Sequence, residues 1–167
     1  PALTDFVFMV RNTSFMFLTG PKIVKAVTHE DVSSDELGGA DVHSTKSGIS
    51  HFTYDSEKEL FEGIRKLVCF LPQNNMEEPP SVECHDPVDR LDAELNYIVP
   101  DEPHKPYDMK VILLKILDNG DFFEIQEYFA PNIIIGFGYL NGHVIGLVAN
   151  QPKYLAGVID GNASIKA

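Results

Sequence analysis

Histidine, cysteine and acidic side chains are the groups in this chain that could bind a metal or act as a base. The chain holds six histidines and two cysteines. His43 and His51 have Lys46 between them and no cysteine or carboxylate at ligand spacing, and Cys84-His85-Asp86 lacks a second half such as a Cys-x-x-Cys pair. We therefore expect no metal site, and free thiols at Cys69 and Cys84.

Motifs for nucleophilic catalysis and for phosphate binding are missing from the sequence. There is no Gly-x-Ser-x-Gly motif and no cysteine with a plausible base nearby. The glycine-rich stretches Gly38-Gly39-Ala40 and Gly136-Phe137-Gly138 lack the spacing of nucleotide-binding loops. The second stretch lies in a strand pattern, where glycine more often admits a close neighbour. Residue types alone therefore indicate no particular reaction.

Two polar segments that contain glycine remain as candidates for binding. At Thr19-Gly20-Pro21 an apolar run leads into a helix, and the N–H groups at a helix N-terminus can bind an oxygen that carries negative charge. The segment from Gly39 to Gly48, GADVHSTKSG, has the small residues, hydroxyls and single histidine typical of a loop that lines a site. A tight turn and a solvated loop, respectively, are the purely structural alternatives.

The elements of the first half are indicated by apolar runs and helix caps. Pro21 suits the first position of a helix, Ser33 or Ser34 can cap a helical turn, and Ser56 and Glu59 have the spacing of a capping box. We expect strands at 5–10 and 14–18, with the first strand buried on both faces, a turn at 11–13, helices at 22–28 and 34–37, and a long helix that ends before Pro72.

The second half begins with a proline-rich stretch that has little periodicity. Asp108 can then cap a helix over 109–117, and Asn141-Gly142 between two apolar runs is the strongest short hairpin signal. We expect a short strand at 122–125, a hairpin around 141–142 and a helix that begins near Asp160.

Composition excludes several classes of protein. The chain has 167 residues, of which 44% are hydrophobic, so it can bury a sizeable core, and no apolar run approaches the length of about 20 residues that a membrane helix needs. The net charge of −12 argues against nucleic acid as the main partner, because no basic stripe is present. No secretory signal is visible, so we expect no export.

Several motifs resemble, in order and spacing, those of biotin-dependent acyl-CoA carboxyltransferases. The matching segments are PALTDF, FMFLTGPKIVKAVT, DELGGADVHSTKSG, FLPQNN, ECHDPVDRLDAEL, IVP, YDM, FFEI, NIIIGFG, NGHVIGLVANQP and NASIKA. The resemblance covers essentially the whole chain and points to the branch of propionyl-CoA carboxylase β subunits, with similarity to the transcarboxylase central subunit. The departures from the family pattern are small and lie at Val158, Ile159 and Gly161.

The resemblance implies an α/β chain with a crotonase-like fold that contains parts of two tandem subdomains. Residues 1–71 would be the C-terminal part of the first, 72–107 a linker, and 108–167 the N-terminal part of the second. In the family, backbone N–H groups of glycine-rich stretches outside the matched region stabilise the oxyanions of the reaction. The resemblance therefore implies that residues 1–167 contain no catalytic residue and are not sufficient for catalysis on their own.

The resemblance also implies a reaction and its partners. CO2 would move from carboxybiotin to the α-carbon of a short acyl-CoA, with propionyl-CoA as the expected substrate and methylmalonyl-CoA as the product. Biotin would be carried by a partner domain, ATP would act only at a separate biotin carboxylase subunit, and the carboxyltransferase subunits would form a homo-oligomer. The compartment would be the cytoplasm of a bacterium or the mitochondrial matrix of a eukaryote. The alternative is a non-catalytic assembly or binding module that retains the scaffold.

The resemblance finally gives the two polar segments a role. In crotonase-like folds the corner that matches Thr19-Gly20-Pro21 lies near the bound thioester, and the segment 39–48 would lie at the mouth of the acyl-CoA and biotin site. The expected substrate-binding residues are Thr19, Gly20, Pro21, Gly39, His43, Ser47 and Gly48.

Overall fold

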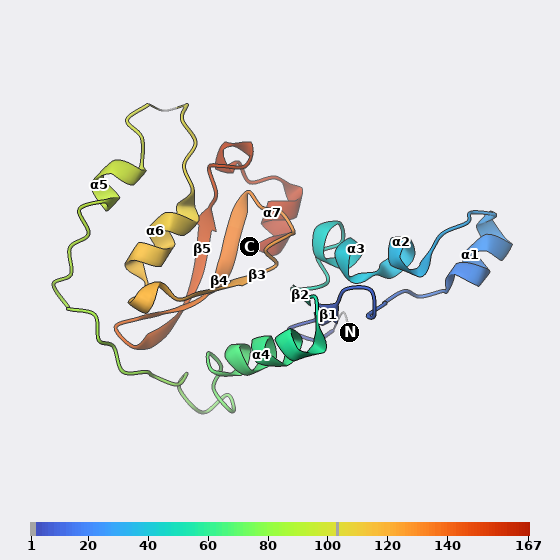
Figure 1. Ribbon diagram of the computed structural model, residues 1–167, viewed down its shortest axis with the longest axis horizontal. Helices are drawn as coiled ribbons and strands as arrows, with labels where there is room; N and C mark the ends of the chain where they lie inside the picture. Colours follow the sequence, from blue (N-terminus) through green and yellow to red (C-terminus); the bar gives the residue numbers. More distant parts are fainter. Residues whose placement is uncertain (1–2, 103) are drawn as a thin grey trace. The chain divides into compact units, whose positions relative to one another are not determined.

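The computed structural model describes residues 3–102 and 104–167, which form two compact units (Figure 1). Unit 1 contains the chain up to Arg65 together with Gln126–Phe129, and unit 2 contains Lys66–Ile125 and Ala130–Ala167. Among the described residues, no helix combines the length and the apolar character needed to cross a membrane.

Unit 1 is built on a pair of short parallel strands. Strand β1 (Phe8–Val10) pairs with β2 (Phe52–Tyr54), and Phe8 stacks on Phe52 with ring centroids 4.6 Å apart. The helices are α1 (Pro21–Thr28), α2 (Ser34–Gly38), α3 (Ala40–Thr45) and α4 (Glu57–Val68), of which the last three residues belong to unit 2.

The helix signals of unit 1 are confirmed. Helix α1 begins at Pro21, where a missing N–H costs nothing. Helix α2 has a complete capping box, in which the Ser33 hydroxyl accepts from the Glu36 N–H and the Glu36 carboxylate accepts from the Ser33 N–H. In α4 the Ser56 hydroxyl accepts from the Glu59 N–H, as the spacing predicts.

Two expectations for unit 1 are wrong. The strand expected at 14–18 is absent from the described structure except for an isolated bridge between Phe15 and Gly39, because these residues meet the junction of α2 and α3 and not another strand. The segment 39–48, expected as a loop, contains helix α3. The hydroxyls of Ser44 and Thr45 donate to the Asp41 carbonyl, so their hydrogen bonds are made within this helix.

Unit 2 is centred on an antiparallel sheet with the order β3-β4-β5. The strands are β3 (Phe122–Ile125), β4 (Ile133–Leu140) and β5 (His143–Asn150). Asn141 and Gly142 join β4 to β5 with φ angles of 51° and 76°, the left-handed values that a two-residue hairpin requires. The hairpin signal and the strand at 122–125 are therefore confirmed.

Short helices complete unit 2. They are α5 (Leu95–Ile98), α6 (Met109–Ile116) and α7 (Gly161–Lys166), with 3-10 turns at Asp118–Gly120 and Leu155–Gly157. The side chain of Asp108 accepts from the Lys110 N–H at the start of α6, and that of Asp160 accepts from the Ala163 N–H at the start of α7. Both predicted caps are confirmed.

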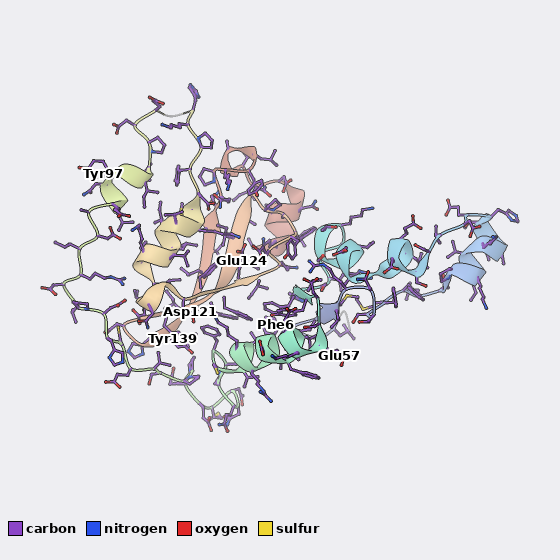
Figure 2. The ribbon with its side chains drawn as sticks, viewed as in Figure 1. Phe6, Glu57, Tyr97, Asp121, Glu124 and Tyr139 are labelled. Atoms are coloured by element: carbon purple, nitrogen blue, oxygen red, sulfur yellow. The ribbon has the colours of Figure 1, made fainter. Side chains whose placement is uncertain are left out.

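The core of unit 2 contains an aromatic stack. Phe70, which is 2% exposed, lies against Phe123, Phe137 and Tyr139, with the Tyr139 ring centroid at 4.9 Å. Tyr139, which is labelled in Figure 2, donates from its hydroxyl to the Cys69 carbonyl, and this bond measures 2.9 Å. Within unit 2, the stack therefore fastens the residues that follow α4, Cys69 and Phe70, to the sheet.

Glycine in β4 admits close neighbours, as its strand pattern indicates. A Cβ on Gly136 would lie 2.4 Å from the Phe123 carbonyl oxygen, and one on Gly138 would lie 2.8 Å from the methyl groups of Leu117. Both positions therefore serve the packing of the sheet.

Candidate functional site

An open, largely apolar pocket of about 540 Å³ lies in unit 1. Its lining residues come from the segment that follows the turn at the end of β1, from α2 and α3, and from the residues after α3. The lining residues are Met16, Phe17, Leu18, Thr19, Leu37, His43 and Ile49. Thr19 and His43, which the sequence nominates separately, therefore lie at one pocket.

His43 is held by hydrogen bonds at both ring nitrogens. The side chain is buried in α3, with Nε2 at 2.6 Å from the Met16 carbonyl oxygen and Nδ1 at 2.9 Å from the Ser47 hydroxyl. A carbonyl oxygen can only accept, so Nε2 carries the proton, and Nδ1 of the neutral ring then accepts from Ser47. His43 is thus an anchored core residue at the edge of the pocket.

The corner at Thr19-Gly20-Pro21 offers fewer backbone donors than its sequence suggests. Gly20 precedes α1 with a φ of −75°, and its carbonyl accepts from the N–H groups of Ile23 and Val24. Pro21 has no N–H to offer. Thr19 is exposed and is the one residue of this corner among the pocket's lining.

Three other predicted site residues serve the local fold. Gly39 is buried between α2 and α3, where a Cβ would lie 2.8 Å from the Asp35 carbonyl oxygen. Gly48 has a φ of +68°, and a Cβ there would lie 2.8 Å from the Phe129 ring. Ser47 is exposed and bonds to His43. These residues are not among those that line the pocket.

Arg11 holds α3 against the end of β1. Its guanidinium pairs with Asp55 at 2.8 Å and with Asp41 of α3 at 2.9 Å, and it lies over the Tyr128 ring at 5.4 Å. Hydrogen bonds to Asp55 and then Asp41 raise the pKa of Arg11 above its ordinary value. This ion-pair cluster helps to fix the helix that carries His43.

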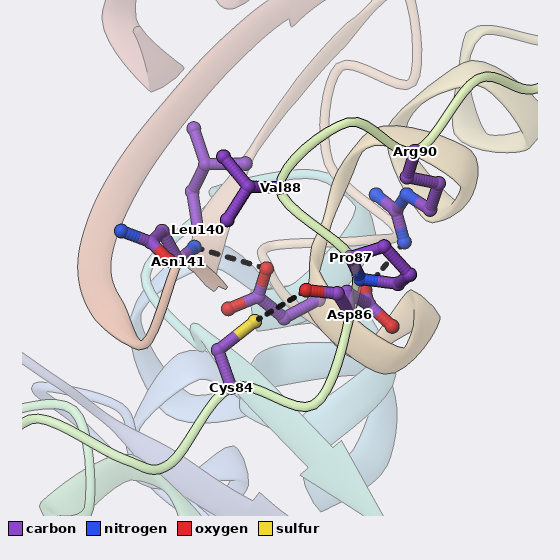
Figure 3. A pocket seen from close by; sticks show the side chains of 8 residues that line it. Cys84, Asp86, Pro87, Val88, Arg90, Leu140 and Asn141 are labelled. Atoms are coloured by element: carbon purple, nitrogen blue, oxygen red, sulfur yellow. Dashed lines mark hydrogen bonds and ion pairs between the residues drawn. The ribbon is translucent and has the colours of Figure 1, made fainter.

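A second, smaller pocket in unit 2 gathers polar groups that are far apart in the sequence (Figure 3). Cys84, Asp86 and Asp118 offer potential metal-ligand atoms that lie within 4.8 Å of one another. Sequence reasoning considered Cys84-His85-Asp86 and missed Asp118, because no local signal connects the two segments. The Asp86 carboxylate is paired with Arg90 and accepts from the Asn119 N–H at 3.2 Å.

Asp118 in this pocket fastens the β4–β5 turn. Its carboxylate accepts from the Gly142 N–H at 2.7 Å and from the Asn141 N–H at 3.0 Å. Burial acts to raise the pKa of Asp118, but the hydrogen bonds from Gly142 and Asn141 outweigh it and leave the pKa below its ordinary value. The polar atoms are thus committed to bonds within the protein, and the cluster is suited to holding the hairpin.

Comparison with known proteins gives consistent matches over the full chain. The family described as the carboxyl transferase domain matches residues 1–167. The carboxyltransferase subunit of propionyl-CoA carboxylase from Haloferax mediterranei is 55% identical over 99% of this chain and 32% of its own length. The methylmalonyl-CoA decarboxylase subunit alpha of Veillonella parvula is 47% identical over 100% of this chain and 33% of its own length. The chain spans about a third of the length of these relatives.

Solved structures give the same picture. A transcarboxylase 12S hexamer, solved with methylmalonyl-coenzyme A and methylmalonic acid bound, matches 100% of this chain and 32% of its own with 44% identity and a TM-score of 0.96. A single-chain long-chain acyl-CoA carboxylase matches 97% of this chain and 15% of its own, with a TM-score of 0.78 at 18% identity, which indicates a shared fold. The α/β, crotonase-like fold implied by the sequence resemblance is confirmed.

Proposed function

Because the chain belongs to the carboxyl transferase domain family, we propose that the protein is part of the carboxyltransferase of a biotin-dependent acyl-CoA carboxylase. It would transfer CO2 from carboxybiotin to the α-carbon of a short acyl-CoA, with propionyl-CoA as substrate and methylmalonyl-CoA as product. The observation that carries the proposal is the 55% identity to a propionyl-CoA carboxylase subunit over nearly the whole chain.

The pocket of unit 1 is the feature of this chain that best suits an acyl-CoA. Its walls come mainly from Met16, Phe17, Leu18, Leu37 and Ile49, so its apolar surface is matched to an acyl group or to the chain that leads to the thioester. Burial of apolar atoms contributes about 25 cal/mol per Å² to binding, before the cost of ordering the ligand. We therefore propose that this pocket receives part of the acyl-CoA.

Among the described residues, the side chains that line the unit 1 pocket do not offer the hydrogen-bond donors that biotin would need. Biotin would arrive on a partner carrier and supply the carboxyl group, and its ureido oxygen would need hydrogen-bond donors. The polar side chains at the pocket are Thr19 and His43, and both ring nitrogens of His43 are already bonded within the protein. We therefore assign no biotin contact to the residues of this pocket.

The proposal extends to organisation and partners. We propose that residues 1–71 belong to a first carboxyltransferase subdomain, that 72–107 link it to a second, and that 108–167 begin the second. The further partners would be a biotin carboxylase and carrier subunit, which alone would use ATP, and sister subunits, by analogy with the solved transcarboxylase hexamer. The compartment would be the cytoplasm in a bacterium or the mitochondrial matrix in a eukaryote.

A second candidate is favoured by one relative. The Veillonella parvula protein is a methylmalonyl-CoA decarboxylase subunit, so the same scaffold could pass the carboxyl group in the opposite direction, from methylmalonyl-CoA to biotin. The alternative to both enzymes is a non-catalytic assembly or binding module that retains the scaffold.

The test uses the full-length protein with a biotinylated carrier. Carboxylated carrier and acetyl-, propionyl- or butyryl-CoA are mixed, and carboxylated acyl-CoA is measured; the reverse assay starts from methylmalonyl-CoA and free carrier. Preferential formation of methylmalonyl-CoA from propionyl-CoA is expected. Transfer that can be driven only from methylmalonyl-CoA would favour the decarboxylase, and the absence of transfer in both directions would favour the non-catalytic module.

A further inference from the structure

One wall of the unit 1 pocket is an irregular segment that α2 and α3 hold in place. This wall, Met16–Thr19, includes Leu18, whose side chain is fully exposed within the described part of the chain. The Met16 N–H donates to the Gly38 carbonyl at 2.8 Å, and Phe15 forms a bridge with Gly39. Backbone bonds therefore attach the wall to the helices at its beginning, at Phe15 and at Met16, the first of the residues that line the pocket.

The Met16 carbonyl is held by His43. Both polar backbone groups of Met16 are bonded, because its N–H donates to the Gly38 carbonyl and its carbonyl accepts from Nε2 of His43 at 2.6 Å. The Ser47 hydroxyl, one turn after His43 in the sequence, bonds to Nδ1 at 2.9 Å and holds the other edge of the ring, while the Met16 carbonyl, which can only accept, requires the proton on Nε2. His43 is buried whereas Ser47 is exposed, so water can replace the bond to Ser47 more easily than the bond to Met16.

We propose that His43 is a positioning residue that fixes the pocket wall Met16–Thr19 through the Met16 carbonyl, with the Ser47 hydroxyl holding the His43 ring in place. This inference rests on the proposed function, in which the pocket receives part of an acyl-CoA. Because both ring nitrogens bond to protein, His43 makes no polar contact with the substrate in this role. Loss of the bond to Met16 therefore weakens acyl-CoA binding and leaves the chemical step largely unchanged.

The test compares two substitutions at His43 in the full-length protein. Gln can place an amide nitrogen near the position of Nε2 and keep the bond to Met16, whereas Asn is shorter and reaches only the position of Nδ1. We expect His43→Asn to raise the KM for acyl-CoA about tenfold, the size expected when a half-buried carbonyl loses its hydrogen bond, with kcat within about twofold of wild type. His43→Gln should stay within about threefold of wild type in KM.

Hydrogen exchange measured by mass spectrometry gives a readout that does not depend on activity. Faster exchange is expected in peptides that cover 16–20 for His43→Asn, and wild-type exchange for His43→Gln. His29→Asn is the matched control, because His29 is an exposed residue in the left-handed conformation that Asn tolerates, and it should change neither exchange nor KM. Equal defects in His43→Gln and His43→Asn, or a fall in kcat at unchanged KM, would overturn the proposal.

A milder variant covers the case in which His43→Asn does not fold. Ser47→Ala removes an exposed hydroxyl, and should raise the KM about twofold to threefold and speed exchange over 16–20. Wild-type KM and exchange in this variant would contradict the proposal. If the wild-type protein transfers no carboxyl group, the proposed function fails, while the exchange measurements still decide whether His43 holds the wall.

Discussion

The tie between Asp118 and the β4–β5 turn leads to a quantitative prediction. Asp118 is 4% exposed, and its carboxylate accepts the N–H groups of Asn141 and Gly142 at 3.0 and 2.7 Å. Substitution by alanine removes both acceptors and shortens a side chain that is nearly enclosed by protein. The turn would then keep its left-handed backbone without the group that holds it.

The magnitude follows from the burial of each donor. The Gly142 N–H is buried, so its loss of a partner costs about 1–3 kcal/mol, whereas the Asn141 residue is exposed and water can replace the carboxylate at a smaller cost. We therefore expect Asp118→Ala to lower the free energy of unfolding by about 2–4 kcal/mol. Asp118→Asn should lose less, because one oxygen still accepts.

Urea unfolding of the full-length protein and hydrogen exchange over 139–144 measure this effect. Faster exchange should be confined to the hairpin at low urea, and the unfolding midpoint should fall at an unchanged slope. Asp89→Ala is the matched control, because Asp89 is exposed and the structure records no ion pair or hydrogen bond for it. An Asp118→Ala variant within about 0.5 kcal/mol of wild type, with unchanged exchange, would refute the reasoning.

Three further predictions concern pH, backbone conformation and packing. The pKa of Asp118 is lowered on folding, so its contribution is complete above the unfolded value of about 4 and is lost as the pH falls through the folded value; the urea midpoint of Asp118→Asn should fall less in acid than that of wild type. Gly48→Ala should lower the free energy of unfolding by about 2 kcal/mol or more, because the φ of Gly48 is +68° and the Phe129 ring is 2.8 Å from the new Cβ. Gly20→Ala, at a φ of −75°, should stay within about 0.5 kcal/mol of wild type in thermal unfolding. Phe70→Ala should cost about 3–5 kcal/mol in urea unfolding through the lost aromatic stack, and a cost below about 1 kcal/mol would contradict the packing.

Local signals in the sequence identified most elements because their cause is local. The cap at Ser33, the caps at Asp108 and Asp160, and the Asn141-Gly142 turn each depend on residues within one turn of one another. The strand expected at 14–18 failed for the opposite reason. Its apolar residues satisfy a strand pattern, but their partner is the junction of two helices, which the residues themselves do not specify.

The candidate site was only partly predictable. Thr19 and His43 were nominated from different segments, and the structure brings them to one pocket. The apolar lining from Leu37 and Ile49 was not foreseen, since isolated apolar residues look like ordinary core in a sequence. The association of Asp118 with Cys84 was also missed, because it depends on how a proline-rich segment folds back on the hairpin.

The two sheets differ in how far apart their partners lie in the chain, and this has a consequence for the order in which they form. A hairpin such as β4–β5, joined by two residues, closes in about 1–10 μs, because little chain must be ordered before its first contacts form. The parallel pair joins Phe8 to Phe52, and the segment between them contains α1, α2 and α3. Closing this longer loop costs more chain entropy, so the pair forms more slowly. During synthesis, β1 therefore leaves the ribosome before the β4–β5 hairpin, but it pairs with β2 slowly, whereas the hairpin closes soon after β5 is synthesised.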